Sequence, residues 1–511
     1  MNRKNILIAV AMLAVIVGGV WAAGGSEPAA ASGGQSNAGR ALKDTLKVAL
    51  WEEPATLDPQ ASNRISWGTV ELNIFDKLVY QDESGKILPR LATEWKFIDD
   101  LPLEMKLRKD VTFHDGSKFT AEDVLFSLKR GKTFPVSAST YAFFDPDNSV
   151  IVDPYTIRLK FKFPNAAVFN TLASLRGNIV SKAAVTAMGD AAHARNPVGT
   201  GPYKMVSWKS GTEIVMVRND AYWGEKAFTK NLVFRFIPEA GNRVIELETG
   251  GVDAIFEVSG SDVQRVEKLK DAHVLMGPSN RYVTLTFSMK DPVLSNKDVR
   301  YALAYAIDKK AVVDAVYAGT ATVATGMYPS NVFAFKEKGM MPYDLAKAKE
   351  YLAKAGYPQG FSMNFLIDPD ETSARTAEII QNMWGQIGVK VSTFQMVAST
   401  YAAQGNKFQA GMRSGNANEP SNILIIYDSA FKERLEPNDK WIDEKLAAAK
   451  TFYDDKKRIA AYQEIQDYLY DARYTVPLAF TSVIYGLSDR VEGWKCEPLQ
   501  QVDMKNVKVY Q

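Results

Sequence analysis

One histidine of the chain stands next to a carboxylate, in the segment Phe113-His114-Asp115-Gly116. Such a histidine can act as a general base in hydrolysis, provided that a nucleophile and an orienting group lie within reach. The Asp-Gly pair is also a turn signal, and Thr120-Ala-Glu-Asp123 directly after it has the pattern that opens a helix. Since the sequence suggests no nucleophile nearby, we expect a structural role for His114.

The other candidates for chemistry fit structural roles better. Gly199-Thr-Gly201-Pro-Tyr203 is glycine-rich like a phosphate-binding loop, but it lacks the lysine of that motif, and Pro202 removes a backbone donor. We therefore expect a tight turn before a strand. The single thiol, Cys496, is expected to be buried and structural, and His193 and His273 to face solvent rather than bind a metal. The sequence predicts no metal site and no cofactor.

A polar loop is the best candidate for binding a small molecule. It runs from Gly411 to Asn422 with the sequence GMRSGNANEPSN, and it follows a predicted strand. Its amides can hydrogen-bond a neutral polar ligand, and the guanidinium of Arg413 can hold a carboxylate through two parallel hydrogen bonds. An ordinary surface loop is the alternative at this point.

The elements that must position these residues are a mixture of strands and helices. Alternation predicts a strand over 156–163, with the apolar residues through Phe163 on one face, and another strand over 213–217. Helical spacing predicts one helix over 296–319, which Asn296 can cap and Gly319 can end.

Between 342 and 394 the pattern alternates in a regular order. It predicts a helix (344–356), a strand (361–367), a helix (372–388) and a strand (389–394). This order is typical of a sheet with crossover helices. We expect an α/β protein with α+β elements, built from two lobes.

Composition excludes several classes of protein. The chain has 511 residues, 46% hydrophobic and 23% charged, as in a globular protein of more than one domain. Lys and Arg number 61 against 59 Asp and Glu, so we expect no nucleic-acid binding. One cysteine excludes an internal disulfide framework and a cysteine-rich metal site.

The first residues predict export. Arg3 and Lys4 precede an apolar run from Ile6 to Val20, which is the order of a secretory signal peptide, here 1–22 with cleavage after Ala22. An uncleaved anchor is the alternative, and the lack of a cysteine after the run argues against a lipoprotein. Residues 23–44 are rich in Gly, Ser and Ala and predict a flexible linker. We expect a periplasmic protein.

A set of eight motifs, in the expected order, resembles bacterial extracellular solute-binding protein family 5, the dipeptide, oligopeptide and nickel branch of ABC-importer binding proteins. The most specific motif is Leu107-Arg-Lys-Asp-Val-Thr-Phe-His-Asp-Gly116 together with Phe119-Thr-Ala-Glu-Asp-Val124. The other motifs are Thr56-Leu-Asp-Pro59, Pro89-Arg-Leu-Ala-Thr-Glu-Trp95, Gly199-Thr-Gly-Pro-Tyr203, Arg218-Asn-Asp-Ala-Tyr-Trp223, Gly250-Gly-Val-Asp253, Val299-Arg-Tyr-Ala-Leu-Ala-Tyr-Ala-Ile-Asp308 and Tyr343-Asp-Leu-Ala-Lys-Ala-Lys349.

The resemblance implies a two-lobed clamshell with an extra subdomain and a ligand enclosed between the lobes. It implies lobe I with its inserted subdomain over 45–285, lobe II over 286–478, and a return to lobe I over 479–511. Two strands would cross between the lobes, near Arg281–Phe287 and Leu478–Tyr485. Closure about such hinges is a population shift that the ligand drives.

The resemblance also implies a site. In the peptide binders a loop that matches Arg413–Leu424 lies in the cleft, where a tryptophan comes first and an aspartate three residues later pairs with the ligand's amino group. This chain has Arg413 and Asn416 at those positions, and Glu419 offers a negative charge from a shifted position. The expected ligand-binding residues are Trp51, Glu53, Tyr282, Arg413, Ser414, Gly415, Asn416, Glu419, Asn422 and Tyr485.

The ligand itself stays open. A neutral amide at position 416 replaces a carboxylate poorly as the partner of an ammonium group, which leaves room for a modified peptide, an anionic ligand or an oligosaccharide. We expect a monomeric, non-enzymatic peptide-binding protein that delivers its ligand to an ABC permease in the inner membrane. An oligosaccharide binder of the same family is the first alternative, and an exported hydrolase is the less favoured second.

Overall fold

The structure is a computed structural model, and it describes residues 39–62, 64, 67–82, 86–98, 102–397, 407–416, 418–431 and 435–511. The expected signal peptide at 1–22, and residues 23–38 of the expected linker, lie outside the described residues. Among the described helices, none combines the length and the apolar composition that crossing a membrane requires.

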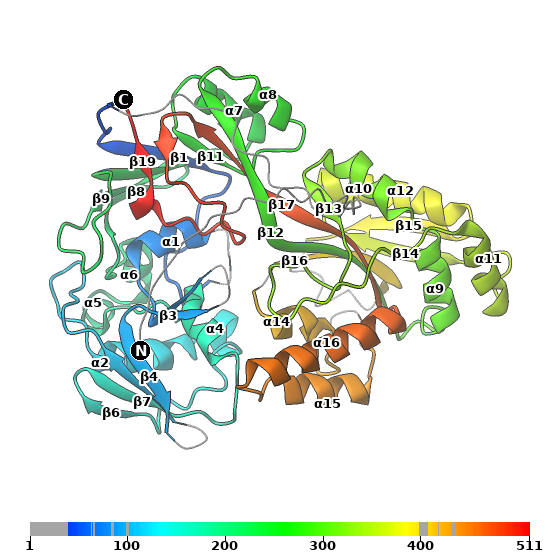
Figure 1. The fold of residues 1–511 in the computed structure, drawn as a ribbon, viewed down its shortest axis with the longest axis horizontal. Coiled ribbons are helices and arrows are strands. Elements are labelled where there is room, and N and C mark those ends of the chain that lie inside the picture. The colour runs from blue at the N-terminus through cyan, green and yellow to red at the C-terminus, as the bar shows by residue number, and fades with distance from the viewer. Residues whose placement is uncertain are drawn as a thin grey trace, which may run out of the picture. The chain divides into compact units, whose positions relative to one another are not determined.

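The largest sheet of the described chain mixes parallel and antiparallel neighbours (Figure 1). Its strands follow the order β15-β14-β16-β12-β17-β11-β1-β10-β9-β8, and β13 pairs with β17. Those nearer the N-terminus are β1 (Thr45–Leu50), β8 (Tyr203–Lys209), β9 (Glu213–Arg218), β10 (Asn231–Phe236), β11 (Ala254–Phe256) and β12 (Ala272–Phe287). The later strands are β13 (Ala321–Val323), β14 (Ser362–Ile367), β15 (Lys390–Gln395), β16 (Ala410–Asn416) and β17 (Thr475–Ser488).

Two long antiparallel strands, β12 and β17, connect the two ends of this sheet (Figure 1). Residues 272–278 of β12 pair with 482–488, beside β11, and residues 282–286 pair with 475–480, beside β16. The register shifts between Pro278 and Tyr282 and again between Val283 and Thr284. One hydrophobic core lies around Val283 and the helices between residues 297 and 385, and another around Val483, β1 and β10.

The order predicted for 342–394 is confirmed. Helices α11 (Leu345–Lys354) and α12 (Glu371–Gly385) alternate with β14 and β15, which are parallel neighbours. Asp344 caps α11 as expected, because its carboxylate accepts a hydrogen bond from the Lys347 amide at 3.0 Å. The fully buried ring of Trp384 anchors α12 on Phe365 of β14, with ring centroids 5.6 Å apart.

The single helix predicted over 296–319 is wrong, since two helices occupy this stretch. They are α9 (Lys297–Tyr305) and α10 (Lys309–Tyr317). Asn296 caps the first as expected, but the Asp308 carboxylate accepts a hydrogen bond from the Ala311 amide at 2.9 Å and caps a second helix. The apolar stripe continues across both helices, which is why periodicity alone missed the break.

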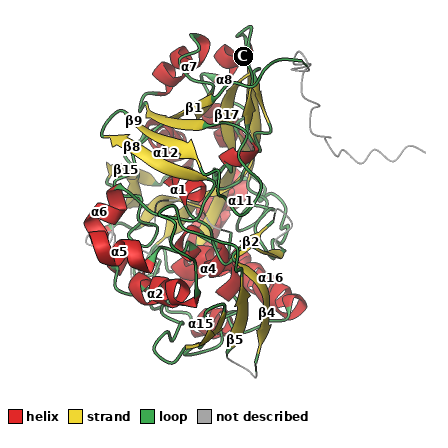
Figure 2. Ribbon diagram, turned by 90° about the vertical axis from the view of Figure 1, so that its left-hand side faces the viewer, coloured by secondary structure: helices red, strands yellow, loops and turns green. Residues whose placement is uncertain are grey.

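A separate antiparallel sheet has the order β4-β5-β7-β6 and lies apart from β1, β8 and β9 (Figure 2). Its strands are β4 (Ala92–Phe97), β5 (Leu103–Leu107), β6 (Val150–Asp153) and β7 (Thr156–Leu159). The strand predicted over 156–163 is therefore too long: β7 ends at Leu159, opposite Leu103, where its partner β5 begins. Phe163, which was predicted to lie on the apolar face of this strand, falls beyond its end and is 51% exposed.

Further helices pack around these sheets. The predicted opening of α2 (Ala121–Gly131) is confirmed, because the Thr120 amide donates a hydrogen bond to the Asp123 carboxylate at 2.9 Å in a capping box. The other helices are α1 (Gly68–Ile74), α3 (Pro135–Ala138), α4 (Val168–Ala173), α5 (Lys182–Met188), α6 (Asp190–Arg195), α7 (Ala240–Glu248), α8 (Val263–Glu267), α14 (Pro420–Leu424), α15 (Lys440–Ala449) and α16 (Asp455–Ala472). Two small antiparallel sheets pair β2 (Val79–Gln81) with β3 (Ile87–Pro89) and β18 (Val491–Glu492) with β19 (Lys508–Val509).

His193 is fully buried, so the prediction that it faces solvent is wrong. Its Nε2 accepts a hydrogen bond from the Val198 amide at 3.3 Å, and its ring lies 6.2 Å from that of Phe75. Asp190, in the same short helix α6, forms an ion pair of 2.8 Å with Arg130. Burial lowers the pKa of His193.

Candidate ligand-binding site

Strand β16 carries the polar segment that the sequence singled out. It pairs with β12 so that Gly415 lies opposite Tyr282 and Arg413 opposite Thr284, on one face of the sheet. The Tyr282 ring covers Gly415, since a Cβ atom there would lie 2.5 Å from the phenol oxygen. Burial raises the pKa of Tyr282, and the nearby Arg413 guanidinium opposes the rise. The structure thus brings Tyr282, Arg413 and Gly415 together.

Glu419 is held by the protein itself. It is 3% exposed, its carboxylate forms an ion pair of 2.5 Å with Arg458, and it accepts a hydrogen bond of 3.2 Å from the Tyr462 hydroxyl. It also caps α14 through the Ser421 amide. These contacts neutralise the charge that the sequence suggested for a ligand's ammonium group.

The neighbours of Glu419 in the loop differ in exposure. Ser414 and Asn422 are exposed. Asn416 ends β16, and its Oδ1 atom is buried without a hydrogen-bond partner. This oxygen can accept a hydrogen bond from a donor group of a ligand.

The three remaining expected residues belong to the other end of the sheet. Trp51 packs on Phe256 with ring centroids 6.0 Å apart, and Tyr485 is fully buried with its ring 5.0 Å from the same phenylalanine. Glu53 accepts hydrogen bonds from the Trp208 indole at 2.7 Å and the Gly211 amide at 2.8 Å. Burial opposes ionisation of Glu53, but these bonds outweigh it and lower its pKa. All three have structural contacts.

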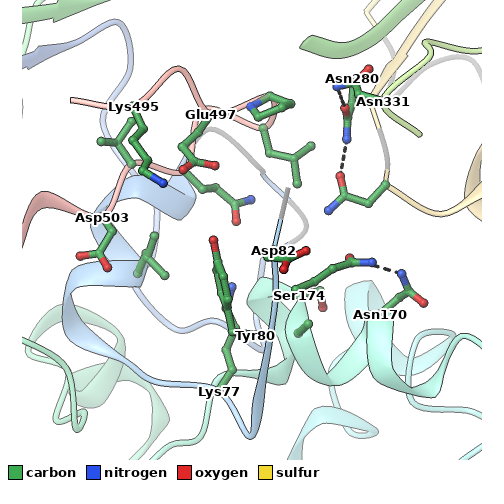
Figure 3. A pocket seen from close by; sticks show the side chains of 18 of the residues that line it. Lys77, Tyr80, Asp82, Asn170, Ser174, Asn280, Asn331, Lys495, Glu497 and Asp503 are labelled. Atoms are coloured by element: carbon green, nitrogen blue, oxygen red, sulfur yellow. Dashed lines mark hydrogen bonds between the residues drawn. The ribbon is translucent and has the colours of Figure 1, made fainter. Parts of the chain in front are cut away.

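The described residues line a partly open cavity of about 890 Å³. This volume lies within the range of about 300–1,000 Å³ that is usual for small-ligand sites. Its walls come from distant segments: 72–82 and 170–174 on one side, 330–334 and Asn418 on the other, and 493–506 from the C-terminal segment (Figure 3). The ten residues expected from the sequence are not among those that line it.

Three asparagines form the amide-rich wall of this cavity. Asn280 of β12 donates a hydrogen bond to the Oδ1 of Asn418 and accepts one at its own Oδ1 from Asn331 (Figure 3). On the facing wall, Asn170 donates to Gln81 at 3.4 Å. Side-chain amides both donate and accept, so this wall can recognise peptide groups or hydroxyl groups.

Charged side chains of both signs also line the cavity. Asp76 forms an ion pair of 2.9 Å with Arg90, and Asp503 forms one with Lys505. Lys77 is 7% exposed; burial lowers its pKa to about 8, with Arg90 acting in the same direction. Lys77 therefore still carries its charge at neutral pH.

Sequence reasoning missed most of this lining. The side chains that Figure 3 labels are Lys77, Tyr80, Asp82, Asn170, Ser174, Asn280, Asn331, Lys495, Glu497 and Asp503. One signal was available: Asn280 directly precedes Arg281–Phe287, which the family resemblance implied to be a crossing strand. Segments 170–174 and 493–506 have no comparable signal, because only the fold brings them to the cavity.

The pair His114 and Asp115 has no arrangement for hydrolysis among the described residues. The His114 ring accepts a hydrogen bond from the Gly199 amide at 3.3 Å and donates one to the Gly201 carbonyl at 3.0 Å. Asp115 instead accepts from the Ser117 amide and hydroxyl. Burial lowers the pKa of His114 to about 4. His114 thus holds the turn that precedes β8.

The remaining thiol and histidine are also accounted for. Cys496 is half-buried and lines the cavity, and burial raises its pKa to about 11, so the group is a neutral thiol. His273 lies 2.7 Å from Asp489, with its side chain 40% exposed. Among the described residues, no group of three or more His, Cys, Asp or Glu has the arrangement of a metal site.

Known proteins resemble this chain over most of its length. The family model of bacterial extracellular solute-binding proteins, family 5 Middle, matches residues 86–433. Heme-binding protein A of Haemophilus influenzae is 30% identical over 492 residues, which cover 89% of each protein. The dipeptide-binding protein of Escherichia coli K12 is 26% identical over 505 residues, covering 91% of this chain and 94% of the relative.

A solved structure agrees in fold. It is the ABC transporter-associated periplasmic binding protein DppA from Helicobacter pylori in complex with the peptide STSA. Its TM-score is 0.79 at 25% identity, and the match covers 92% of this chain and 99% of that one.

Proposed function

Because the chain belongs to the bacterial extracellular solute-binding proteins of family 5, it is a substrate-binding component of an ABC importer, and we propose that its ligands are short peptides. The mixed α/β, two-lobed fold that the sequence predicted is that of its structural neighbours. Relatives in the family are named as binding dipeptides, glutathione and heme. The cavity described above is our proposed site.

The amide-rich wall carries the proposal of a peptide ligand. Asn280, Asn331 and Asn418 offer donors and acceptors to a peptide backbone from one side of the cavity, and Asn170 and Gln81 offer them from the other. A ligand that contacts both walls stabilises the arrangement in which the walls lie close together. Closure of this kind follows from the differential affinity of the ligand for the closed state.

The termini of a peptide also find charges in this cavity. Lys77 and Lys495 suit its carboxylate, and Asp82 and Glu497 suit its ammonium group. Glu419 does not serve here, because it does not line this cavity and its charge is neutralised by Arg458.

The test is ligand-induced thermal stabilisation of the mature protein after unfolding and refolding, with pools of di- to pentapeptides, oligosaccharides and nickel chelates. A ligand at about 100 times its Kd adds about 2.7 kcal/mol to the free energy of unfolding. We expect a rise in Tm with peptides and at least tenfold weaker binding in Asn280→Ala. The matched control is Asn148→Ala, whose amide bonds only to Asp145 on an exposed surface. If none of the peptides raises the Tm, the proposal is contradicted.

An oligosaccharide is the second candidate, because one aromatic ring is placed for stacking. Tyr80 is 40% exposed and its ring points into the cavity (Figure 3). Aromatic faces and amide side chains together suit sugar rings and their hydroxyl groups. Stabilisation by oligosaccharides alone, and its loss in Tyr80→Ala, favour this candidate over peptides. If sugars are the ligands, the carboxylate introduced by Asn416→Asp should weaken sugar binding or raise the affinity for peptides.

Further proposals concern export and assembly. We propose that 1–22 is a cleaved signal peptide, that 23–44 is a linker, and that the mature chain is a periplasmic monomer that docks on a membrane permease. We propose lobe I at 45–285 and 479–511, and lobe II at 286–478. N-terminal sequencing of the exported protein tests the cleavage after Ala22, and light scattering tests the monomer.

A further inference from the structure

A contact outside the cavity joins two segments that are far apart in the sequence. The Ala166 amide donates a hydrogen bond to the Lys450 carbonyl at 2.7 Å. The Asn165 amide donates one to the Tyr453 hydroxyl oxygen at 3.1 Å, and the ring centroids of Phe97 and Tyr453 lie 4.7 Å apart. These five residues are called the rim contact below. None of them is among the residues that line the cavity.

The first half of the rim contact is anchored in β4 and α4. Phe97 ends β4 and packs edge-on against the ring of Phe169 in α4, with centroids 6.2 Å apart. Asn165 forms the turn that leads into α4, because its side-chain oxygen accepts a hydrogen bond from the Ala167 amide at 3.0 Å. The same helix carries Asn170 into the cavity wall. One side of the rim contact is therefore continuous with one wall of the cavity.

The second half of the rim contact lies between α15 and α16. Lys450 ends α15, and Tyr453 comes just before α16 begins. Within α16, the Gln466 amide donates a hydrogen bond to the Ala334 carbonyl at 2.8 Å. Segment 330–334 lines the opposite wall of the cavity. The other side of the rim contact is thus fixed to the other wall.

The rim contact lies away from the strands that connect the two ends of the main sheet. The cavity extends from Pro278 and Asn280 of β12 to Asn170 of α4. In Figure 1 the rim contact lies near the N-terminal end of α16, apart from the crossing of β12 and β17. A register shift after Pro278 interrupts the pairing of these two strands, and such a shift bends a strand locally. A contact at the far side of the cavity can form only while the two walls lie close together.

We propose that the rim contact is a latch, which holds the two walls of the cavity in the closed arrangement. Residues that never touch the ligand then set part of its affinity. This inference rests on the proposed function, in which closure of the cavity captures the ligand.

The expected effect follows from the population of the closed state. The apparent Kd equals the intrinsic Kd divided by the fraction of protein that is competent to hold the ligand. One aromatic pair and one neutral hydrogen bond change the ratio of closed to open protein by roughly three- to tenfold. Loss of the latch should therefore speed ligand release, because the walls separate more often, and leave the association rate nearly unchanged.

The first test needs no ligand. The backbone hydrogen bond between Ala166 and Lys450 places their Cα atoms roughly 5 Å apart, which a disulfide can span. In the mature protein with Ala166→Cys and Lys450→Cys, oxidation by copper phenanthroline should form a disulfide, measured by non-reducing electrophoresis. Adding Tyr453→Ala should slow its formation at least about threefold. The two single cysteine variants control for Cys496, and Tyr343→Ala, at another exposed tyrosine, is the matched control.

The second test measures the release of the peptide that raises the Tm most, by surface plasmon resonance. Tyr453→Ala should raise the dissociation rate at least about threefold and change the association rate less than about twofold. Tyr453→Phe keeps the ring but loses the hydroxyl, so its effect should be smaller. Tyr343→Ala should release the peptide like the wild type.

The outcomes separate the latch from the proposed function. If peptides bind but Tyr453→Ala leaves either the cross-linking rate or the dissociation rate unchanged, the latch is overturned and the proposed function stands. If no peptide binds, the proposed function fails, and cross-linking alone decides. Slower cross-linking in Tyr453→Ala then supports the latch, whereas an equal rate, or no disulfide at all, overturns it.

Discussion

Removing the charge of Glu419 should lower the free energy of unfolding but change the affinity for the ligand little. The Glu419 and Arg458 side chains are 4% and 7% exposed and lie 2.5 Å apart. Breaking a buried ion pair by removing one partner costs about 3–5 kcal/mol, because the other charge stays buried and uncompensated. Glu419→Gln should therefore lower the free energy of unfolding by about 3 kcal/mol.

Urea denaturation followed by far-UV circular dichroism measures this change. The matched control is Glu464→Gln, which breaks an exposed pair with Lys445 and should cost at most about 1 kcal/mol. Removing both charges in Glu419→Gln/Arg458→Met should recover much of the lost stability, since no charge is then left buried alone. A loss below about 1 kcal/mol in Glu419→Gln would refute this reasoning. A tenfold loss of peptide affinity in the folded variant would show instead that Glu419 contacts the ligand.

Two further predictions concern the turn at His114 and the strand pair at Tyr282. The pKa of His114 is lowered to about 4 in the folded protein, whereas a histidine of the unfolded chain titrates near 6.5. Between these two pH values the unfolded chain binds a proton that the folded protein does not bind. The free energy of unfolding therefore falls as the pH falls from about 6.5 to about 4. Over this pH range the wild type should lose about 3 kcal/mol of its free energy of unfolding. Urea denaturation at pH 7 and at pH 4.5 should show a smaller loss for His114→Asn. An identical pH dependence of the two proteins would count against a buried neutral ring. Gly415→Ala should lower the free energy of unfolding by about 1–3 kcal/mol, because the new methyl group meets the buried Tyr282 ring. The control Gly241→Ala, on α7 with open space around it, should be neutral or stabilising, and equal effects at both glycines would contradict the packing argument.

The sequence predicted those elements that depend on neighbours in the chain. Asp344 and Thr120 are capping residues with local partners, and the β14–α12–β15 unit follows from local periodicity. The break before Asp308 was hidden because the apolar stripe continues through it. The end of β7 depends on where β5 begins, about fifty residues away, and no local pattern carries that information.

The candidate site was predicted less well, for a related reason. The family resemblance located the segment from Arg413 onward, but the predicted loop is wrong in its first half, because residues through Asn416, with its buried acceptor, belong to β16. However, it could not show that Arg458 neutralises Glu419 or that Tyr485 is buried against Phe256, because both depend on packing between distant segments. The cavity is lined by segments as distant as 72–82 and 493–506, and only the complete fold brings them together.

The C-terminal residues complete the part of the fold that begins with β1, and this sets the order in which the chain can fold. The Thr69 hydroxyl bonds to the carbonyl of Gln500, and the Met504 amide donates to Asn73 at 3.1 Å. Val507 and Val509 are fully buried in the same core as Leu46 and Val48. Because these contacts span more than 400 residues, their loop closure is slow, and the first segments cannot finish folding until the last ones have been synthesised. The core around β1 is therefore completed only after the whole chain has been synthesised, whereas the β14–α12–β15 unit depends on contacts between neighbouring segments.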